Sequence, residues 1–239
     1  MSAGEPSLGP PGGGPKIIVA IDGPAGAGKS TIARHLARHF GLLNLETGAM
    51  YRAFALKALR ADVPLDAADA LENLAGQTII HLESGDADNR VFLDGEDVTS
   101  LLREQAITDA ASRVSVFPVI RAWMVRLQQQ VGARGGVVME GRDIGTVVFP
   151  NADAKIFLDA APEVRGMRRY DQLGQFNPKQ EKPPEEVIRD LHERDQRDRN
   201  RADSPLRPAA DAVILDSTNM TLEEAVAAAE AIVAKKLTH

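Results

Sequence analysis

Short apolar runs typical of buried strands alternate along this chain with stretches whose apolar residues recur at helical spacing. The expected strands are residues 17–21, 42–45, 136–139, 154–158 and 213–215. Strands that are apolar on both faces are typical of parallel sheets covered by helices. The pattern therefore predicts an α/β fold with a five-stranded parallel sheet flanked by helices.

Helical spacing occupies most of the intervals between these runs. The expected helices are about residues 49–61, 65–74, 104–115, 118–131 and 222–237, and a turn is expected at Glu46 to Gly48 before the first of them. Thr221 and Glu224 form a T-x-x-E capping box before the last of them. A charged helical region precedes the last strand, and its break at Asn177 to Pro184 is the segment expected to move.

Three short β-like runs interrupt this alternating order. They cover residues 78–83, 90–93 and 96–98, with Gly85-Asp86 and Asp94-Gly95 between them. Asp-Gly between two strand-like runs is a strong hairpin signal. A small antiparallel insertion, about residues 77–99, is therefore expected to form its own lobe.

The first strand leads into a glycine loop that carries recognisable chemistry. Gly23, Gly28, Lys29 and Ser30 satisfy the pattern G-x-x-x-x-G-K-[ST], between a strand and a helix. Glycines let backbone N–H groups turn inward, and the new helix directs its positive end at the same point. We expect residues 23–31 to bind a nucleotide triphosphate. Lys29 would reach the outer phosphates, Ser30 would bind Mg²⁺, and Thr31 is a weaker candidate for the inner phosphate.

Composition narrows the function classes. The chain has 239 residues, 44% of them hydrophobic, and no cysteine, which excludes disulfides and thiolate chemistry. The five histidines are scattered in the sequence, so we expect no metal cluster from them and a Mg²⁺ ion held by oxygen ligands instead. The net charge of −6 argues against a general nucleic-acid surface. No membrane span or secretory signal is recognisable, so a cytoplasmic protein is expected.

Arginines dominate the region between residues 165 and 201. Within ERDQRDRNR, the spacing of Arg194, Asp198 and Arg201 places two guanidiniums and a carboxylate on one helix face. This face could bind a ligand, or it could be a solvated helix whose charges, including Asp195, alternate in salt bridges. Arginine suits a bidentate grip on phosphate, and phosphoryl transfer needs cations rather than a strong nucleophile. A kinase that acts by positioning and electrostatics fits the residues present.

At this point the sequence resembles the bacterial cytidylate kinases from Lys16 to the C-terminus. The motifs that carry the resemblance are IDGPAGAGKST, ETGAMYR, GRDIGTVVFP and RDQRDRNR. The resemblance implies an ATP-dependent nucleoside monophosphate kinase that uses Mg²⁺ and converts CMP or dCMP to the diphosphate. It also implies a kinase domain over 16–239, whereas residues 1–15 are rich in glycine and proline and are expected to form a disordered tail. The monophosphate-binding lobe would lie within 47–115 and a lid at about 163–195.

The family's site residues carry over to matching positions. The ATP-binding set would be Gly23, Pro24, Ala25, Gly26, Ala27, Gly28, Lys29, Ser30 and Thr31, with the lid arginines Arg165, Arg168 and Arg169. The cytosine would face Ser112, Arg121 and Asp143. The monophosphate would be held by Thr47, Tyr51, Arg52, Arg142, Arg194 and Arg201, with Asp198 at the ribose. Lys29, Arg142, Arg194 and Arg201 would be catalytic.

Each assignment has a structural alternative. Asp143 could pair with Arg142, Tyr51 could be a half-buried core aromatic, and Ser112 could be an ordinary helical serine. Glu46 departs from the family, which usually has Asp there, so it is left out of the site. Rival functions are a kinase for another acceptor, such as UMP, dTMP or shikimate, and an ATPase or switch protein. A monomer is the default expectation from the resemblance.

Overall fold

The computed structural model describes residues 16–83, 89–176 and 182–237. These residues belong to two compact units. The first unit comprises Met1–Ile18 and Ala37–Met139, and the second comprises Val19–Leu36 and Glu140–His239. No helix among the described residues is long and apolar enough to cross a membrane.

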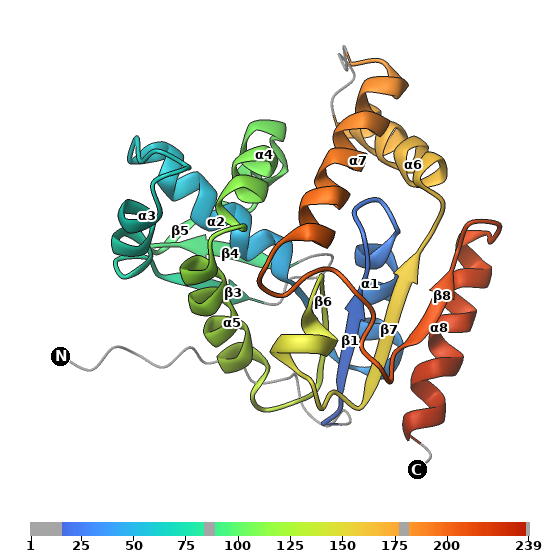
Figure 1. The fold of residues 1–239 in the computed structure, drawn as a ribbon. Helices are drawn as coiled ribbons and strands as arrows, with labels where there is room; N and C mark the ends of the chain where they lie inside the picture. The colour runs from blue at the N-terminus through green and yellow to red at the C-terminus, as the bar shows by residue number, and fades with distance from the viewer. Residues whose placement is uncertain (1–15, 84–88, 177–181, 238–239) are drawn as a thin grey trace. The chain divides into compact units, whose positions relative to one another are not determined.

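Five strands form one parallel sheet, in the order β2-β6-β1-β7-β8 (Figure 1). They are β1 (Ile18–Asp22), β2 (Leu43–Glu46), β6 (Val137–Gly141), β7 (Ala154–Asp159) and β8 (Val213–Asp216). All five residues of β6 are buried, as are four of the five in β1 and five of the six in β7. The sheet, its parallel direction and the position of each strand confirm the prediction from the apolar runs.

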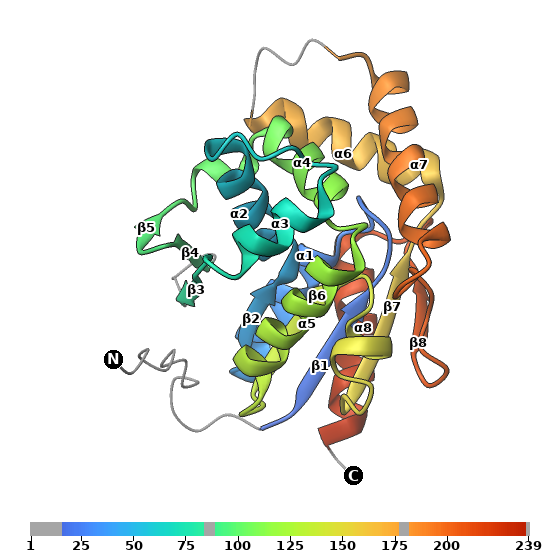
Figure 2. The same ribbon diagram turned by 60° about the vertical axis from the view of Figure 1, so that its left-hand side comes forward.

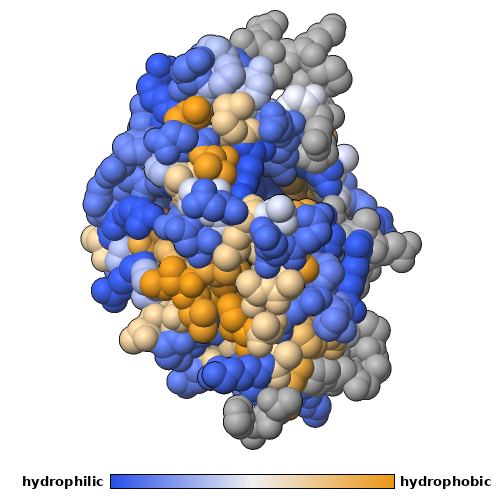
Figure 3. Space-filling model, turned by 90° about the vertical axis from the view of Figure 1, so that its right-hand side faces the viewer, coloured by the Kyte–Doolittle hydropathy of each residue, from blue (hydrophilic) through white to orange (hydrophobic). Residues whose placement is uncertain are grey.

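The last strand differs from that prediction. We expected β8 to be buried on both faces, but Val213 is 44% exposed and Ile214 is 63% exposed. Among the described residues β8 is an edge strand paired with β7 alone, so fewer neighbours cover its side chains. Figure 3 looks onto this side of the second unit and shows hydrophobic side chains gathered among hydrophilic ones.

The second unit contains most of the helix that follows β1 and three further helices. They are α1 (Lys29–Phe40), α6 (Pro162–Phe176), α7 (Pro184–Asn200) and α8 (Leu222–Leu237). α6 packs against α7, and the two helices lie next to each other in both ribbon views (Figures 1 and 2). A Cβ on Gly166 would lie 2.3 Å from a carbon of Ile188, so glycine permits this close packing. The capping box of α8 is confirmed, because Thr221 and Glu224 exchange backbone-to-side-chain hydrogen bonds.

The first unit holds the antiparallel insertion and the helices around it. Its helices are α2 (Thr47–Arg60), α3 (Ala68–Ala75), the short 3₁₀ turn η1 (Leu101–Arg103), α4 (Gln105–Val114) and α5 (Pro118–Gly132). Its strands β3 (Ile80–Glu83), β4 (Arg90–Leu93) and β5 (Glu96–Asp97) pair antiparallel (Figure 2). Phe54 on α2 contacts Trp123 on α5 with ring centroids 5.2 Å apart. The small antiparallel sheet is confirmed.

Two turn predictions have different outcomes. Asp94 and Gly95 both adopt positive φ, 51° and 90°, as the two central residues of a tight hairpin turn require, and they join β4 to β5. The turn expected at Glu46 to Gly48 is wrong. Glu46 is extended and α2 begins at Thr47, so strand and helix join without an intervening turn. The predicted turn at Gly85-Asp86 lies outside the described residues, as do residues 177–181 of the break predicted at Asn177 to Pro184.

Candidate active site

The loop after β1 has the strand–loop–helix form that its sequence predicts. Gly23 has a φ of 149°, and a Cβ there would lie 1.9 Å from the carbonyl oxygen of Leu158 on β7. Only glycine lets the loop leave the sheet this close to its neighbouring strand. Lys29 opens α1, is 6% exposed, and its Nζ donates a 2.7 Å hydrogen bond to the carbonyl of Pro24. The lysine therefore lies folded over its own loop.

Lys29 lies in a strongly cationic environment. Burial, together with the charges of Arg142 and Arg194, lowers the pKa of Lys29 to about 7, although Glu140 and Asp22 oppose the shift. The lysine, two arginines and two carboxylates thus act on one another within the second unit. Arrangements that perturb a lysine in this way are frequent at sites that bind and transfer charged groups.

Asp198 is buried and is the centre of a group of partly buried arginines. Its carboxylate accepts a 2.9 Å hydrogen bond from Nε of Arg142 and lies 3.7 Å from Nη1 of Arg201. Burial acts to raise the pKa of Asp198, but the guanidiniums of Arg142, Arg194 and Arg201 outweigh it and hold the pKa below its usual value. The structure therefore brings together four of the residues predicted from two separate motifs.

One detail of that prediction is wrong. Arg201 does not continue the helix face that carries Arg194 and Asp198, because α7 ends at Asn200 and Arg201 is extended, with a ψ of 144°. Its guanidinium still reaches Asp198, and Nε donates to the carbonyl of Ser204 at 2.6 Å. The turn out of the helix, rather than helical periodicity, places this arginine.

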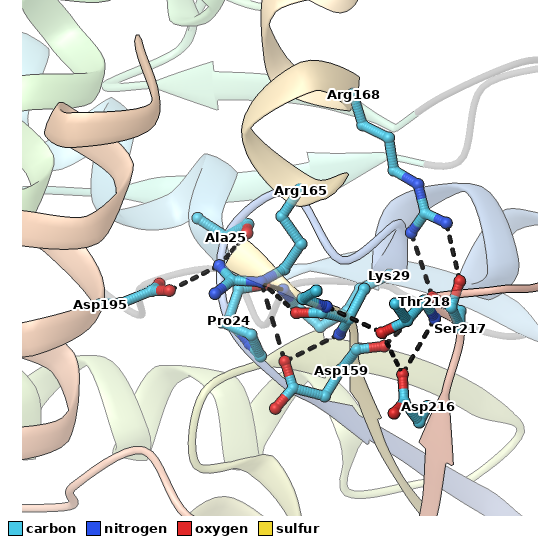
Figure 4. A network of polar contacts seen from close by, with 12 residues as sticks. Pro24, Ala25, Lys29, Asp159, Arg165, Arg168, Asp195, Asp216, Ser217 and Thr218 are labelled. Carbon is cyan, nitrogen blue, oxygen red and sulfur yellow. Dashed lines mark hydrogen bonds and ion pairs between the residues drawn. The ribbon is translucent and has the colours of Figure 1, made fainter. Parts of the chain in front are cut away.

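Arg165 contacts the phosphate-binding loop directly (Figure 4). Its Nη1 donates to the carbonyl of Ala25 at 3.0 Å and lies 2.5 Å from Oδ2 of Asp195, and its Nε donates to the carbonyl of Ala160 at 2.8 Å. Arg165 and Asp195 are 3% and 4% exposed. The alternative that places Asp195 among the alternating charges of a solvated helix is therefore wrong for this residue. The predicted contact of Arg165 with ATP stays a prediction.

The other two predicted lid arginines make different contacts. Arg168 donates from Nη1 to Oγ of Ser217 at 3.1 Å and from Nη2 to its carbonyl at 2.9 Å (Figure 4). Arg169 donates to Oε1 of Gln172, one turn further along α6, at 2.9 Å. Arg168 thus joins α6 to the segment after β8, whereas the hydrogen bond of Arg169 to Gln172 stays within α6.

Asp143 follows β6 and precedes a single turn of π-helix, Ile144–Val148, that the sequence did not indicate. Asp143 is 6% exposed. Next to it lies Asp22, the last residue of β1, whose carboxylate accepts the backbone N–H groups of Ile144 and Gly145. Single π-turns are frequent at functional sites, so this segment is a strong candidate for one.

The remaining substrate-binding candidates belong to the first unit. Thr47, Tyr51 and Arg52 lie on the first turns of α2, and Arg121 lies on α5 with its guanidinium carbon 6.0 Å from the centroid of the Tyr51 ring. Arg121 also donates to the carbonyl of Ser115 at 3.3 Å, and Oγ of Ser115 donates to the carbonyl of Ser112 at 3.0 Å.

These contacts link the candidates of α2, α4 and α5 within that unit. Ser112 and Arg121 are only 6% and 4% exposed, which rules out a fully solvated position for either of them.

Glu46, which departs from the family pattern, forms an ion pair with Arg52 on the first turns of α2. The longer carboxylate therefore contacts a residue of the predicted phosphate site. The sequence prediction does not include Glu46 in that site, and its departure from the family pattern is the only signal in the sequence that indicates it.

The oxygen donors expected of a Mg²⁺ site are present in the second unit. Ser30 lies in the first turn of α1, and the buried carboxylate of Glu140 acts on the neighbouring Lys29. Hydroxyl and carboxylate oxygens are the ligands that Mg²⁺ prefers. The residues present fit the ion that the phosphate-binding motif implies.

The expectation that the histidines contribute to no metal cluster needs correction. His35 and His39 are one turn apart on α1, and Nε2 of His35 is 2.6 Å from Oε1 of Glu230. The three side chains are grouped closely enough to hold a metal ion. The spacing of His35 and His39 places them on one face of α1, whereas only the folded chain brings the carboxylate of Glu230 next to them.

Comparison with known proteins gives one consistent result. The family model of the cytidylate kinases matches residues 19–235. A cytidylate kinase of Solibacter usitatus is 47% identical over 227 residues, which cover 94% of this chain and 95% of the relative. A cytidylate kinase of Desulfitobacterium hafniense is 49% identical over 210 residues, which cover 88% and 89%. Among solved structures, a shikimate kinase from Acinetobacter baumannii is 18% identical with a TM-score of 0.43, over 93% of each chain. The match of the family model and the two relatives places this chain in the cytidylate kinase family.

Proposed function

We propose that this protein transfers the γ-phosphoryl group of ATP to CMP or dCMP, producing ADP and the cytidine diphosphate. The observation that carries the proposal is the convergence of charge in the second unit. The charges of Arg142 and Arg194 act on the buried Lys29 of the phosphate-binding loop. The same two arginines, together with Arg201, surround Asp198. Such a group of cations suits the phosphate oxygens of a donor and an acceptor.

In this proposal the backbone of residues 23–31 cradles the ATP phosphates and Lys29 binds the outer ones. Ser30 would hold Mg²⁺, which would supply positive charge to the phosphate oxygens. The group of arginines around Asp198 orients the monophosphate and neutralises the oxygens that gain charge during transfer. Asp198 keeps those guanidiniums in place, and we expect it to reach the ribose when substrate is bound.

Base selection is assigned to Asp143, and a contribution of Ser112 and Arg121 stays a prediction. A carboxylate accepts a hydrogen bond from the exocyclic amine of cytosine, whereas uracil presents an oxygen at the same place and would be repelled. Asp143 is buried, so a mismatch there is not relieved by water. We expect the enzyme to act in the cytoplasm, as a monomer, on small-molecule substrates.

The reaction is tested by measuring ADP release with MgATP and each nucleoside monophosphate in turn. Rapid turnover with CMP and dCMP, little with UMP, and its loss in Lys29→Ala are expected. ADP formed equally fast without any monophosphate would show an ATPase and contradict the proposal.

Asp143→Asn tests base selection. The amide can donate to the uracil oxygen, so we expect the CMP to UMP ratio of kcat/KM to fall by about tenfold or more. An unchanged ratio in a variant that still turns over CMP would remove Asp143 from base recognition.

A further inference from the structure

Asp22 is a buried carboxylate to which neither the sequence motifs nor the proposed mechanism assigns a role. It is the last residue of β1, is 4% exposed, and directly precedes the phosphate-binding loop. Its two oxygens are used separately. Oδ1 accepts the N–H of Ile144 and Oδ2 the N–H of Gly145, each at 2.7 Å.

The two N–H groups are those of the first residues in the π-turn Ile144–Val148. The first N–H groups of a helical turn have no partner within it, and a side chain of the preceding residue usually supplies one. Asp143 precedes this turn, but its side chain makes no such capping hydrogen bond. The carboxylate of Asp22, 122 residues away in sequence, takes that place.

Capping by Asp22 in place of Asp143 has a consequence for Asp143 itself. A carboxylate that capped its own turn would point at the backbone and accept its N–H groups. With the cap supplied from β1, the backbone of residues 143–145 is held while the Asp143 side chain is not used for capping. The carbonyl of Asp143 accepts the N–H of Val147 at 2.8 Å, which fixes the same residue from the other side.

The surroundings of Gly145 show how closely the two segments fit. A Cβ on Gly145 would lie 3.3 Å from Oδ2 of Asp22 and 3.2 Å from Cδ of Lys155 on β7. The turn is thus held between the carboxylate at the end of β1 and a side chain of the neighbouring strand. Lys29 and Asp143 are both close enough to Asp22 to act on its ionisation.

We propose that Asp22 is a positioning residue for substrate recognition: it anchors the segment that carries Arg142 and Asp143 to the strand that carries the phosphate-binding loop. The inference rests on the proposed function, because it takes Asp143 as the group that recognises cytosine. Loss of the anchor should let Asp143 shift. A shift of roughly a few tenths of an ångström is enough to weaken a hydrogen bond to the base.

The primary test is Asp22→Asn. The amide keeps one acceptor oxygen but turns an NH₂ group towards the second N–H, so one of the two hydrogen bonds is lost. We expect the KM for CMP to rise by about tenfold and the CMP to UMP ratio of kcat/KM to fall by a similar factor. Hydrogen exchange at the amides of Ile144 and Gly145 should become faster, while other amides of the sheet keep their protection.

The matched control is Asp216→Asn. Asp216 is the last residue of β8 as Asp22 is of β1, and its carboxylate also accepts a backbone N–H, that of Thr218. It has no assigned role in either substrate site. This variant should keep the wild-type KM for CMP and the wild-type selectivity.

Gly145→Ala tests the anchor from the other side and leaves the Asp22 carboxylate intact. Its methyl group must displace the carboxylate or Lys155, so we expect a fall in CMP selectivity of about threefold, smaller than in Asp22→Asn. If Asp22→Asn fails to fold, this variant and the exchange of its amides decide the question.

Selectivity and KM for CMP that stay within about twofold of wild type in both variants would overturn the inference. A wild-type enzyme that does not phosphorylate CMP would instead overturn the proposed function. In that case the exchange of Ile144 and Gly145 still reports whether Asp22 anchors the segment, and unchanged exchange would refute that as well.

Discussion

At the scale of single residues, Lys29 shows how burial prepares a charged group for its ligand. Removing an ammonium from water costs free energy, and two arginines nearby increase that cost, so the pKa of Lys29 is lowered to about 7. A triphosphate has the opposite effect, because its negative charge favours the protonated lysine. The empty site is thus electrostatically unfavourable, and nucleotide binding relieves it.

Proton uptake on nucleotide binding follows from this shift. Above pH 7 the free enzyme holds Lys29 largely neutral, so binding of an ATP analogue must return the proton. We expect uptake of about one proton per site near pH 8.5 and little near pH 6, where the lysine is already charged. Calorimetry in two buffers of different ionisation enthalpy measures this number.

Lys29→Met is the control for that measurement, since it removes the titrating group. Uptake of the same size in the variant at pH 8.5 would assign the proton to another residue and contradict the prediction.

At the scale of elements, the buried pair of Arg165 and Asp195 joins α6 to α7 and both helices to the loop after β1. The guanidinium contacts the carbonyl of Ala25 in that loop and the carboxylate on α7 at the same time. Movement of either helix must therefore break a buried charge contact or carry the loop with it. The sequence motif alone suggested only that Arg165 would face ATP.

Breaking this buried pair should lower the free energy of unfolding much more than breaking an exposed ion pair would. Arg165→Met leaves Asp195 buried without its partner, and we expect the free energy of unfolding to fall by about 3 kcal/mol. Asp195→Leu should have a similar effect. The double variant should lose less than the sum of the two, because it leaves neither charge uncompensated. Urea denaturation measures all three.

Arg189→Met is the matched control on α7, because Arg189 is exposed. Its free energy of unfolding should stay within about 0.5 kcal/mol of wild type. Additive losses in the double variant would show that Arg165 and Asp195 do not act as a pair.

At the scale of the whole molecule, the position of a strand in the parallel sheet determines which of its apolar side chains are buried. Val213, Ile214 and Leu215 are equally apolar in sequence, but only Leu215, at 6% exposed, is buried. The order of strands places all three at the edge, and the alternation of side chains along the strand then separates Ile214 from Leu215.

Two substitutions test this difference. Ile214→Lys should change the free energy of unfolding by no more than about 0.5 kcal/mol, because the new charge stays in water. Leu215→Lys should cost about 3 kcal/mol or more, because it places an ammonium against apolar neighbours. Equal effects in urea denaturation would contradict the orientation of β8.

Much of the fold was predictable because its signals are local. The glycines and Lys29 of the loop, the capping box of Thr221 and Glu224, and the Asp94-Gly95 turn each depend on residues within a few positions. The exposed face of β8 was not predictable, since an edge strand and a central strand can have the same apolar run. The start of α2 was misplaced because Thr47 and Gly48 resemble a turn as readily as a first helical turn.

The sequence by itself determined the chemistry available to this protein: a phosphate-binding loop, a surplus of arginines in one region, and motifs of the cytidylate kinase family. Tertiary structure decided which charges meet. Asp22 holds a turn 122 residues away, Asp195 pairs with Arg165, and Arg201 reaches Asp198 from beyond the end of its helix. Local patterns record the conformations that a residue prefers, whereas the pairing of buried charges depends on neighbours that only the folded chain provides.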